Sequence, residues 1–248
     1  MPVSLDATTG QHIGDRTEQQ DRVAIIPSKK LRGTALVILA DGAGGYKGGA
    51  AAADQVLSTA VNLFESFSPK DETPAQLLRE IVLEAHTVIR LNKVLTEEEP
   101  HSTVVAMILQ PDRADWGWVG DSRLYHFRGP ALSNRTKDHS YVQQQIDEGE
   151  WREEDRHEHP NRNLLLQALG HSESPTPSFG AAAPLVAGDS FLLCSDGLWD
   201  YFSDAEIGTS LATLPPRKAA EMLINTARVR ATGRGDNVSV AIVKLTGG

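Results

Sequence analysis

Hydrophobic positions recur at two different spacings along the chain, and the spacing predicts which segments are helices and which are strands. In residues 49–67 apolar side chains recur every three to four positions, which predicts a helix with one buried face. Pro74 suits the first turn of a second helix. The buried stripe of that helix is Leu78, Val82, Ala85 and Ile89. Two long helices that follow one another indicate a pair packed side by side on a sheet.

Shorter apolar runs between turn residues predict strands in much of the remaining chain. Residues 23–26 and 34–40 predict two strands joined by the charged turn SKKLRG. Residues 102–127 hold three strand-like runs, STVVAMIL, ADWGWVG and SRLYHF, which predict an antiparallel meander. The other predicted elements are a helix over 138–149, a polar exposed excursion over 150–163, a strand over 189–195, helices over 204–214 and 216–231, and a strand over 238–245. This pattern indicates the fold class α+β, with helices covering antiparallel sheets.

Composition narrows the class of protein and its partners. The chain has 248 residues, 40% of them hydrophobic, which suits one large domain or two small ones. No apolar run approaches the roughly 18 residues that span a bilayer, and the N-terminus lacks a signal-peptide pattern, so we expect no membrane partner. A single cysteine cannot form an internal disulfide and fits a reducing cytoplasm. A net charge of −9 argues against a nucleic-acid partner.

Five aspartates stand at the ends of apolar runs, in the segments GTALVILADGAGG, WGWVGDSR, SFLLCSDGLWD and GRGDNVSVAIV: Asp41, Asp121, Asp196, Asp200 and Asp236. A lone Asp-Gly after a strand is usually a turn, but four such strand ends favour one shared anionic cavity. Two carboxylates about 5 Å apart repel by roughly 3 kcal/mol at a dielectric near 20, so such a cavity needs cations. All candidate ligands are oxygens, which favours Mg²⁺ or Mn²⁺ over zinc. Two such ions can hold a water for attack on phosphorus.

Seven motifs then occur in an order that resembles a known family: GDRTEQQD, DGAGG, GDSR, TKDHS, NLLLQALG, CSDGLWD and GDNVSV. The family is that of the metal-dependent serine/threonine protein phosphatases of type 2C, and the resemblance extends from Gly14 to Val243. The compact length is similar to that of bacterial stand-alone catalytic domains. The resemblance implies a four-layer α-β-β-α sandwich of two antiparallel sheets flanked by helix pairs. It also implies a single catalytic domain over residues 1–248, with a flap near 138–165.

The resemblance further implies a set of metal ligands. Asp41 is expected to bridge two core ions, with the carbonyl of Gly42 on one of them, and Asp196 and Asp236 are expected to complete the other. A third metal site, seen in many bacterial members, is matched by three aspartates: Asp121, Asp196 and Asp200. The implied cofactors are therefore Mg²⁺ or Mn²⁺, as two core ions with room for a third.

Other positions match supporting roles in the family. Arg16 matches the arginine that clamps the substrate phosphate, a role that suits its planar fork of donors. Asp21 matches the first acidic position, a water-mediated or indirect metal contact. Four further residues are expected to support the ligands: Gln20, Asp138, His139 and Asn237.

Two positions depart from the family pattern. Many eukaryotic members have a histidine where this chain has Ala43, and that histidine is assigned as the general acid for the leaving alkoxide. Ala43 cannot donate a proton, so the resemblance alone leaves a metal-bound water as the expected source. Gln20 stands where some members have glutamate, and its neutral amide is expected to lower the affinity for the second ion.

The remaining reactive side chains have structural interpretations. Ser122 and Ser195 lack the spacing of a nucleophile elbow, so we expect turn and supporting hydroxyls. Cys194 lies in the apolar run FLLC and is expected to be a buried thiol. His157 and His159 lie in the charged excursion and are expected to be solvated flap residues.

The function expected from these features is metal-dependent hydrolysis of phosphoserine and phosphothreonine on proteins, without a covalent enzyme intermediate. The expected partners are phosphoproteins of a cognate serine/threonine kinase, and the chain is expected to be a cytoplasmic monomer. One alternative is a phosphatase for a small phosphoester or a regulator of the anti-sigma type. The other is a catalytically silent protein that binds phosphoproteins. Metal titration together with hydrolysis assays separates these possibilities.

Overall fold

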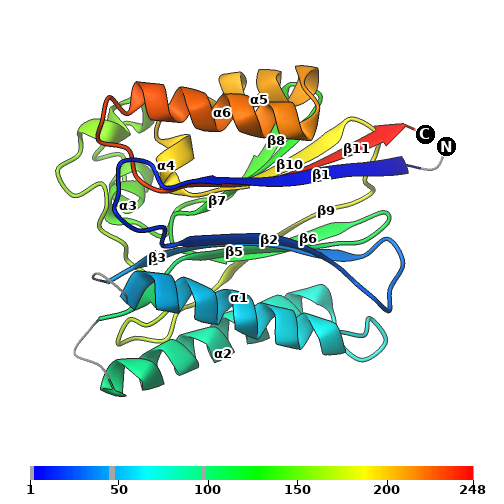
Figure 1. Cartoon of the computed structure of the whole chain (residues 1–248), viewed down its shortest axis with the longest axis horizontal. Coiled ribbons are helices and arrows are strands. Elements are labelled where there is room, and N and C mark those ends of the chain that lie inside the picture. The colour runs from blue at the N-terminus through cyan, green and yellow to red at the C-terminus, as the bar shows by residue number, and fades with distance from the viewer. Residues whose placement is uncertain (1–2, 45–47, 96–98, 248) are drawn as a thin grey trace.

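Four layers make up the computed structural model, which describes residues 3–44, 48–95 and 99–247 (Figure 1). Two antiparallel sheets face each other in the middle. Helices α1 (Gly48–Ser66) and α2 (Pro74–Leu95) cover one sheet, and α5 (Asp204–Thr213) and α6 (Pro216–Arg230) cover the other. The predicted fold class, a sandwich of two sheets between helix pairs, is confirmed. No helix in these ranges is long and apolar enough to cross a membrane.

Each sheet consists of strands from distant parts of the sequence. The first has the order β1 (Val3–His12), β11 (Val238–Gly247), β10 (Asp189–Cys194), β7 (Arg123–Arg128) and β8 (Ala131–Arg135). The second has the order β2 (Asp21–Pro27), β3 (Ala35–Ala43), β5 (Val104–Leu109), β6 (Ala114–Val119) and β9 (Ser178–Ala182), and β4 (His101–Ser102) pairs with the end of β3.

Strand β3 shows why the apolar runs in this chain are continuous. Its alternate side chains Leu36 and Ile38 pack toward α1 and α2, whereas Val37 and Leu39 pack into the core between the sheets. A strand covered on both faces has no solvent face for polar residues. The apolar run of β3, and Asp41 near the end of this strand, therefore lie in the middle of the molecule.

The predicted three-strand meander over 102–127 is wrong in its third strand. Strands β5 and β6 pair as predicted, but β7 pairs with β10 and β8 in the other sheet. The chain changes sheets at Gly120, whose φ of +101° is open to glycine and strained for other residues. A Cβ there would also lie 2.7 Å from Thr103 Cγ2. Asp121 thus lies at a crossing between the sheets, not in a hairpin.

The predicted helix over 138–149 is shorter in the structure, where α3 spans Tyr141–Asp147. The backbone of the residues before it is engaged elsewhere: the His139 N–H donates to Gly120 O at 2.9 Å, and Ser140 pairs with Leu165. Ser140 also caps the helix, since its hydroxyl accepts from the Gln143 N–H.

Candidate active site

Helices α3 and α4 (Asp196–Trp199) lie toward one end of the molecule (Figure 1). Four of the predicted aspartates, Asp41, Asp121, Asp196 and Asp236, come together around the start of α4. They surround a cavity of about 480 Å³. Eight of the predicted site residues line it: Arg16, Gln20, Asp41, Gly42, Asp121, Asp196, Asp236 and Asn237. The sequence reasoning assigned no role to six other lining residues. Thr17 and Glu18 lie in the motif GDRTEQQD, and Asn163 and Leu165 lie in NLLLQALG, whereas His101 and Thr103 lie in none of the seven motifs.

Asp41 is held near the end of β3 by the neighbouring strand. Its N–H donates to Thr103 Oγ1 at 3.1 Å, and the Thr103 N–H donates to Asp41 O at 2.8 Å. The next residue, Gly42, lies against the start of α1, where an added Cβ would come within 2.0 Å of Gly49 O. Only glycine permits this close approach, which brings the main chain and the carboxylate to one wall of the cavity.

Asp21 lies opposite Asp41 in the β2–β3 pair and is fully buried. Its Oδ2 accepts a hydrogen bond from Ser195 Oγ at 2.8 Å, whereas its Oδ1 has no hydrogen-bond partner within the described ranges. Burial raises the pKa of Asp21 to about 6, although the hydroxyls of Ser239 and Ser195 oppose the shift. An orphaned buried carboxylate oxygen fits a position that a cation or its hydration water would satisfy.

The short helix α4 organises three of the aspartates. Asp196 is its first residue, and the Asp200 N–H donates to Asp196 O at 3.1 Å, one helical turn later. Trp199 on the same helix donates from Nε1 to Asp121 O at 3.0 Å. Asp200 also faces Arg162, whose Nη1 lies 3.6 Å from Asp200 Oδ2. The spacing of four residues between Asp196 and Asp200 suits one helical turn, and the structure has that turn, although four residues are too few for a hydrophobic period.

Arg16 extends over the rim of the cavity and pairs with Asp236 at 2.6 Å. Its side chain is 61% exposed, and the pKa of Arg16 is raised chiefly by this pair and further by Asp196 and Asp41. Buried Asn237 holds the loop that carries Arg16. Its Oδ1 accepts from the Gln20 N–H at 2.7 Å, and its Nδ2 donates to the carbonyls of Ile13 (2.8 Å) and Glu18 (3.0 Å). Asn237 and Gln20 therefore position the arginine loop.

The carboxylates of the cavity are close enough to repel one another. Burial, followed by repulsion from the other aspartates, raises the pKa values of Asp41 and Asp196 well above their usual range. Burial and the charge of Asp138 raise the pKa of Asp121 to about 7. In the described ranges no group of three or more carboxylate, imidazole or thiol side chains is arranged closely enough to hold a metal ion by itself. The oxygens line a cavity, and a donor set of this kind fits hard divalent cations.

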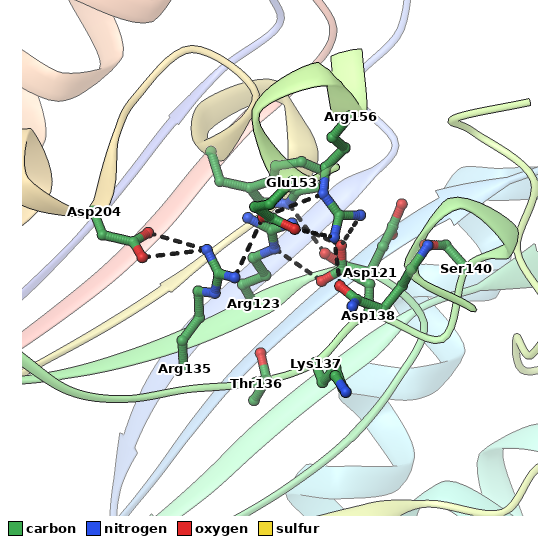
Figure 2. A network of polar contacts seen from close by, with 12 residues as sticks. Asp121, Arg123, Arg135, Thr136, Lys137, Asp138, Ser140, Glu153, Arg156 and Asp204 are labelled. Carbon is green, nitrogen blue, oxygen red and sulfur yellow. Dashed lines mark hydrogen bonds and ion pairs between the residues drawn. The ribbon is translucent and has the colours of Figure 1, made fainter. Parts of the chain in front are cut away.

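Behind the cavity, Asp138 forms part of a buried network (Figure 2). It accepts from Arg123 Nε (2.8 Å) and Nη2 (2.7 Å) and from Arg156 Nη1 (3.1 Å). Glu153 joins Arg156 to Arg135 at 2.9 and 3.3 Å. Arg123 also lies over the Trp199 ring at 3.6 Å, which connects the network to α4. We define the flap network as Arg123, Arg135, Asp138, Glu153, Arg156 and Asp204.

His139 fixes the turn that carries Asp121. Its Nδ1 accepts from the Gly120 N–H at 3.2 Å, so Nε2 carries the proton and donates to Ser178 Oγ at 3.0 Å. The ring stacks on Trp118, and burial lowers the pKa of His139. A neutral imidazole bonded on both nitrogens supports the site through the backbone of its neighbour.

The flap differs from the solvated excursion expected over 150–163. His157 is exposed, but His159 is only 8% exposed, because it lies between the rings of Trp151 and Tyr141 at 4.8 and 5.7 Å. Arg156 is also buried, by its ion pairs. Ser122, Ser195 and Cys194 are buried as supporting groups, as predicted.

Comparison with known proteins identifies the family. Residues 9–228 match the family Protein phosphatase 2C. Serine/threonine protein phosphatase PstP of Mycobacterium tuberculosis is 35% identical over 219 residues, 86% of this chain and 41% of that protein. The chain thus spans about two fifths of the length of that relative.

Solved structures agree with this assignment. The crystal structure of the Mycobacterium tuberculosis serine/threonine phosphatase PstP/Ppp has a TM-score of 0.84 at 30% identity, over 99% of this chain and 100% of that chain. A second, of the PstP catalytic domain in complex with two manganese ions, has a TM-score of 0.79 at 30% identity, over 99% of both chains. With the match over residues 9–228, these likenesses show that the chain belongs to the protein phosphatase 2C family of serine/threonine protein phosphatases.

Proposed function

We propose that this chain hydrolyses phosphoserine and phosphothreonine on proteins with Mg²⁺ or Mn²⁺ as cofactor. The observation that carries the proposal is the cavity in which Asp41, Asp121, Asp196 and Asp236 face one another below Arg16. Carboxylates that raise each other's pKa in one buried place destabilise the fold unless cations bind there. The two manganese ions in the related PstP catalytic domain support the same conclusion.

The proposed ligands follow from the positions of the oxygens. Asp41, Gly42, Asp196 and Asp236 all line the same cavity. Asp21, with its orphaned Oδ1, acts from beneath the cavity. Asp121 and Asp200, on either side of Trp199, are the candidate residues for a third ion, together with Asp196. When bound, the ions supply Lewis-acid charge and activate water for attack on phosphorus.

Arg16 is the proposed phosphate-binding residue. One Nη2 contact to Asp236 leaves the rest of an exposed guanidinium, which has five N–H donors in all, facing the cavity mouth. A planar fork suits two phosphate oxygens and neutralises part of the charge of the transferring group. Asp236 thus connects phosphate binding to the metal cavity.

Hydrolysis of a chromogenic phosphoester with Mn²⁺, with Mg²⁺ and with chelator tests this function. We expect turnover that requires a metal, and a higher kcat/KM on phosphoserine peptides than on phosphorylated metabolites. A folded protein that binds Mn²⁺ but hydrolyses neither class would refute the proposal and favour the silent phosphoprotein-binding alternative. Single-domain organisation over residues 1–248, a cognate kinase, the monomeric state and a cytoplasmic location stay predictions from the sequence.

A further inference from the structure

His101 occupies a position in the site that the sequence did not reveal. It forms β4 with Ser102, and the pairing of β3 with β4 places His101 directly opposite Ala43. Its side chain lines the same cavity as Asp41, Asp196 and Asp236. Among the described residues that line this cavity, His101 is the one imidazole.

The contacts of the ring define which nitrogen can exchange a proton with a ligand. His101 Nδ1 lies 2.9 Å from the carbonyl oxygen of Glu99, and a carbonyl only accepts, so Nδ1 carries a proton. Nε2 is then the nitrogen left for proton exchange. A backbone carbonyl on Nδ1 that fixes the tautomer is the usual arrangement for an imidazole that transfers protons at Nε2.

Phosphoserine hydrolysis requires such a donor. The leaving group is an alkoxide, a strong base, and a positioned acid that protonates it in the transition state contributes about 10²–10⁴-fold to the rate. Ala43 has no proton to give, and the four aspartates of the cavity are the proposed metal ligands.

We propose that His101 is the general acid of this phosphatase, in place of the water expected from the resemblance alone. The inference rests on the proposed function. In the step, the oxygen of the attacking water forms a bond to phosphorus and the bond from phosphorus to the serine oxygen breaks. The proton on His101 Nε2 passes to that serine oxygen, and the two protons of the water stay on the new phosphate, so the products are serine and dihydrogen phosphate. The imidazole leaves the step neutral and is reprotonated from solvent.

Charged and titratable neighbours of His101 come from three segments. Lys93 on α2 pairs with Glu99 at 2.9 Å, and the ring of His171 lies 5.3 Å from the ring of His101. His171, with His101 and Lys93, lines a second cavity of about 790 Å³ on the other side of His101. His171 lies outside the lining of the metal cavity, so it provides a matched control for a change at His101.

The test compares two leaving groups in one preparation of each variant. In His101→Gln, we expect kcat on a phosphoserine peptide to fall about 100-fold, whereas kcat on p-nitrophenyl phosphate, whose leaving group needs little protonation, changes by less than about threefold. His171→Gln should leave both rates within about twofold of the parent protein. The ratio of the two rates is independent of the folded fraction, so partial unfolding cannot imitate the effect.

A rescue variant uses the strand register. Because Ala43 lies opposite position 101, Ala43→His in the His101→Gln background should restore phosphoserine turnover at least about tenfold. An equal loss on both substrates, or an unchanged rate on phosphoserine, would overturn the role of His101. Absence of turnover by the parent protein on both substrates would instead refute the proposed function.

Discussion

The aspartate-lined cavity, with Asp41, Asp121, Asp196 and Asp236, and the flap network contain the same kind of acidic side chain in opposite surroundings. In the network, Asp138 is held by two arginines at 2.7–3.1 Å. In the cavity, the strongest charge effects on Asp41 and Asp196 come from other carboxylates. An aspartate paired with arginine side chains stabilises the folded structure. An aspartate surrounded by other carboxylates destabilises it unless a cation from solution binds between them.

Asp121 lies between the two regions and shows their influence on each other. Its pKa is raised by burial and by the charge of Asp138, while Arg123 lowers it. A change in the network therefore alters the charge state of the cavity without contact with a ligand. Five changes test the difference between the two regions, in order of decreasing expected effect.

Asp196→Asn should abolish activity while leaving the protein folded. We expect turnover of p-nitrophenyl phosphate to fall about 1,000-fold, equivalent to about 4 kcal/mol in the barrier, because an amide is a poor ligand for a hard cation. Asp204→Asn, in the flap network, is the control and should stay within about twofold. Similar losses in both variants would show that the two regions do not differ.

Asp138→Asn should lower the stability of the protein, in contrast to Asp196→Asn, which should lower activity and leave the protein folded. Removing this charge leaves Arg123 and Arg156 partly unpaired in a buried place, which costs about 3 kcal/mol. Urea unfolding monitored by circular dichroism measures this change in the free energy of unfolding. Arg135→Gln, with a 27% exposed side chain, should cost less than about 1 kcal/mol. A small loss for Asp138→Asn would contradict the stabilising role of the network.

Without metal, the stability of the protein should fall as the pH rises from about 4 to about 7. In the folded protein Asp21 and Asp121 keep their protons up to a pKa of about 6 and about 7, whereas unfolded aspartate releases its proton near pH 3.9. The folded state thus binds more protons in this window, and the free energy of unfolding decreases as they leave.

Mn²⁺ should reverse that loss. At 100 times its Kd, the ion should raise the free energy of unfolding at pH 7 by about 2.7 kcal/mol. Thermal unfolding at pH 5 and pH 7, in chelator and in Mn²⁺, measures both effects. Stability in chelator that rises between pH 5 and pH 7 would show that the aspartates do not repel one another as described.

Arg16→Gln should have the smallest effect, with its main part in substrate binding. We expect KM for a phosphopeptide to rise about tenfold, or about 1.4 kcal/mol, because one charged donor group to phosphate is lost. Its exposed pair with Asp236 adds about 0–1 kcal/mol, so Tm should hardly change. Arg152→Gln, which removes another exposed arginine that pairs with an aspartate, should leave KM unchanged.

The sequence predicted the elements whose faces are buried. The periodicity of 49–67 and the apolar run of β3 follow from packing against the cores that they form. The unpredicted strands β1, β8 and β9 are all at sheet edges, where one side is solvated and the hydrophobic pattern fades. Edge strand β2, whose residues are mostly half-buried, was predicted from its apolar run, whereas β1 and β8, which the pattern missed, are mostly exposed.

Long-range register is what the sequence could not supply. The pairing of Ala43 with His101, which places an imidazole in the cavity, joins residues from separate strands, and no local pattern encodes it. The burial of Arg156 likewise depends on its ion pair with Asp138. In the sequence, Asp138 precedes α3 and Arg156 follows it. Both results come from tertiary contacts, and these override local polarity.

The pairing of β1 with β11 has a consequence for how the molecule can be connected. The register runs from Val3 opposite Gly247 to His12 opposite Val238, so the two ends of the described chain lie together. Ten residues of strand, about 30 Å, separate them from the loops of Arg16 and Asp236. A short peptide could join these ends into a ring, which would lower the entropy of the unfolded chain. A tether at this end of the sheet would therefore leave the aspartate-lined cavity, at the other end of the strands, unobstructed.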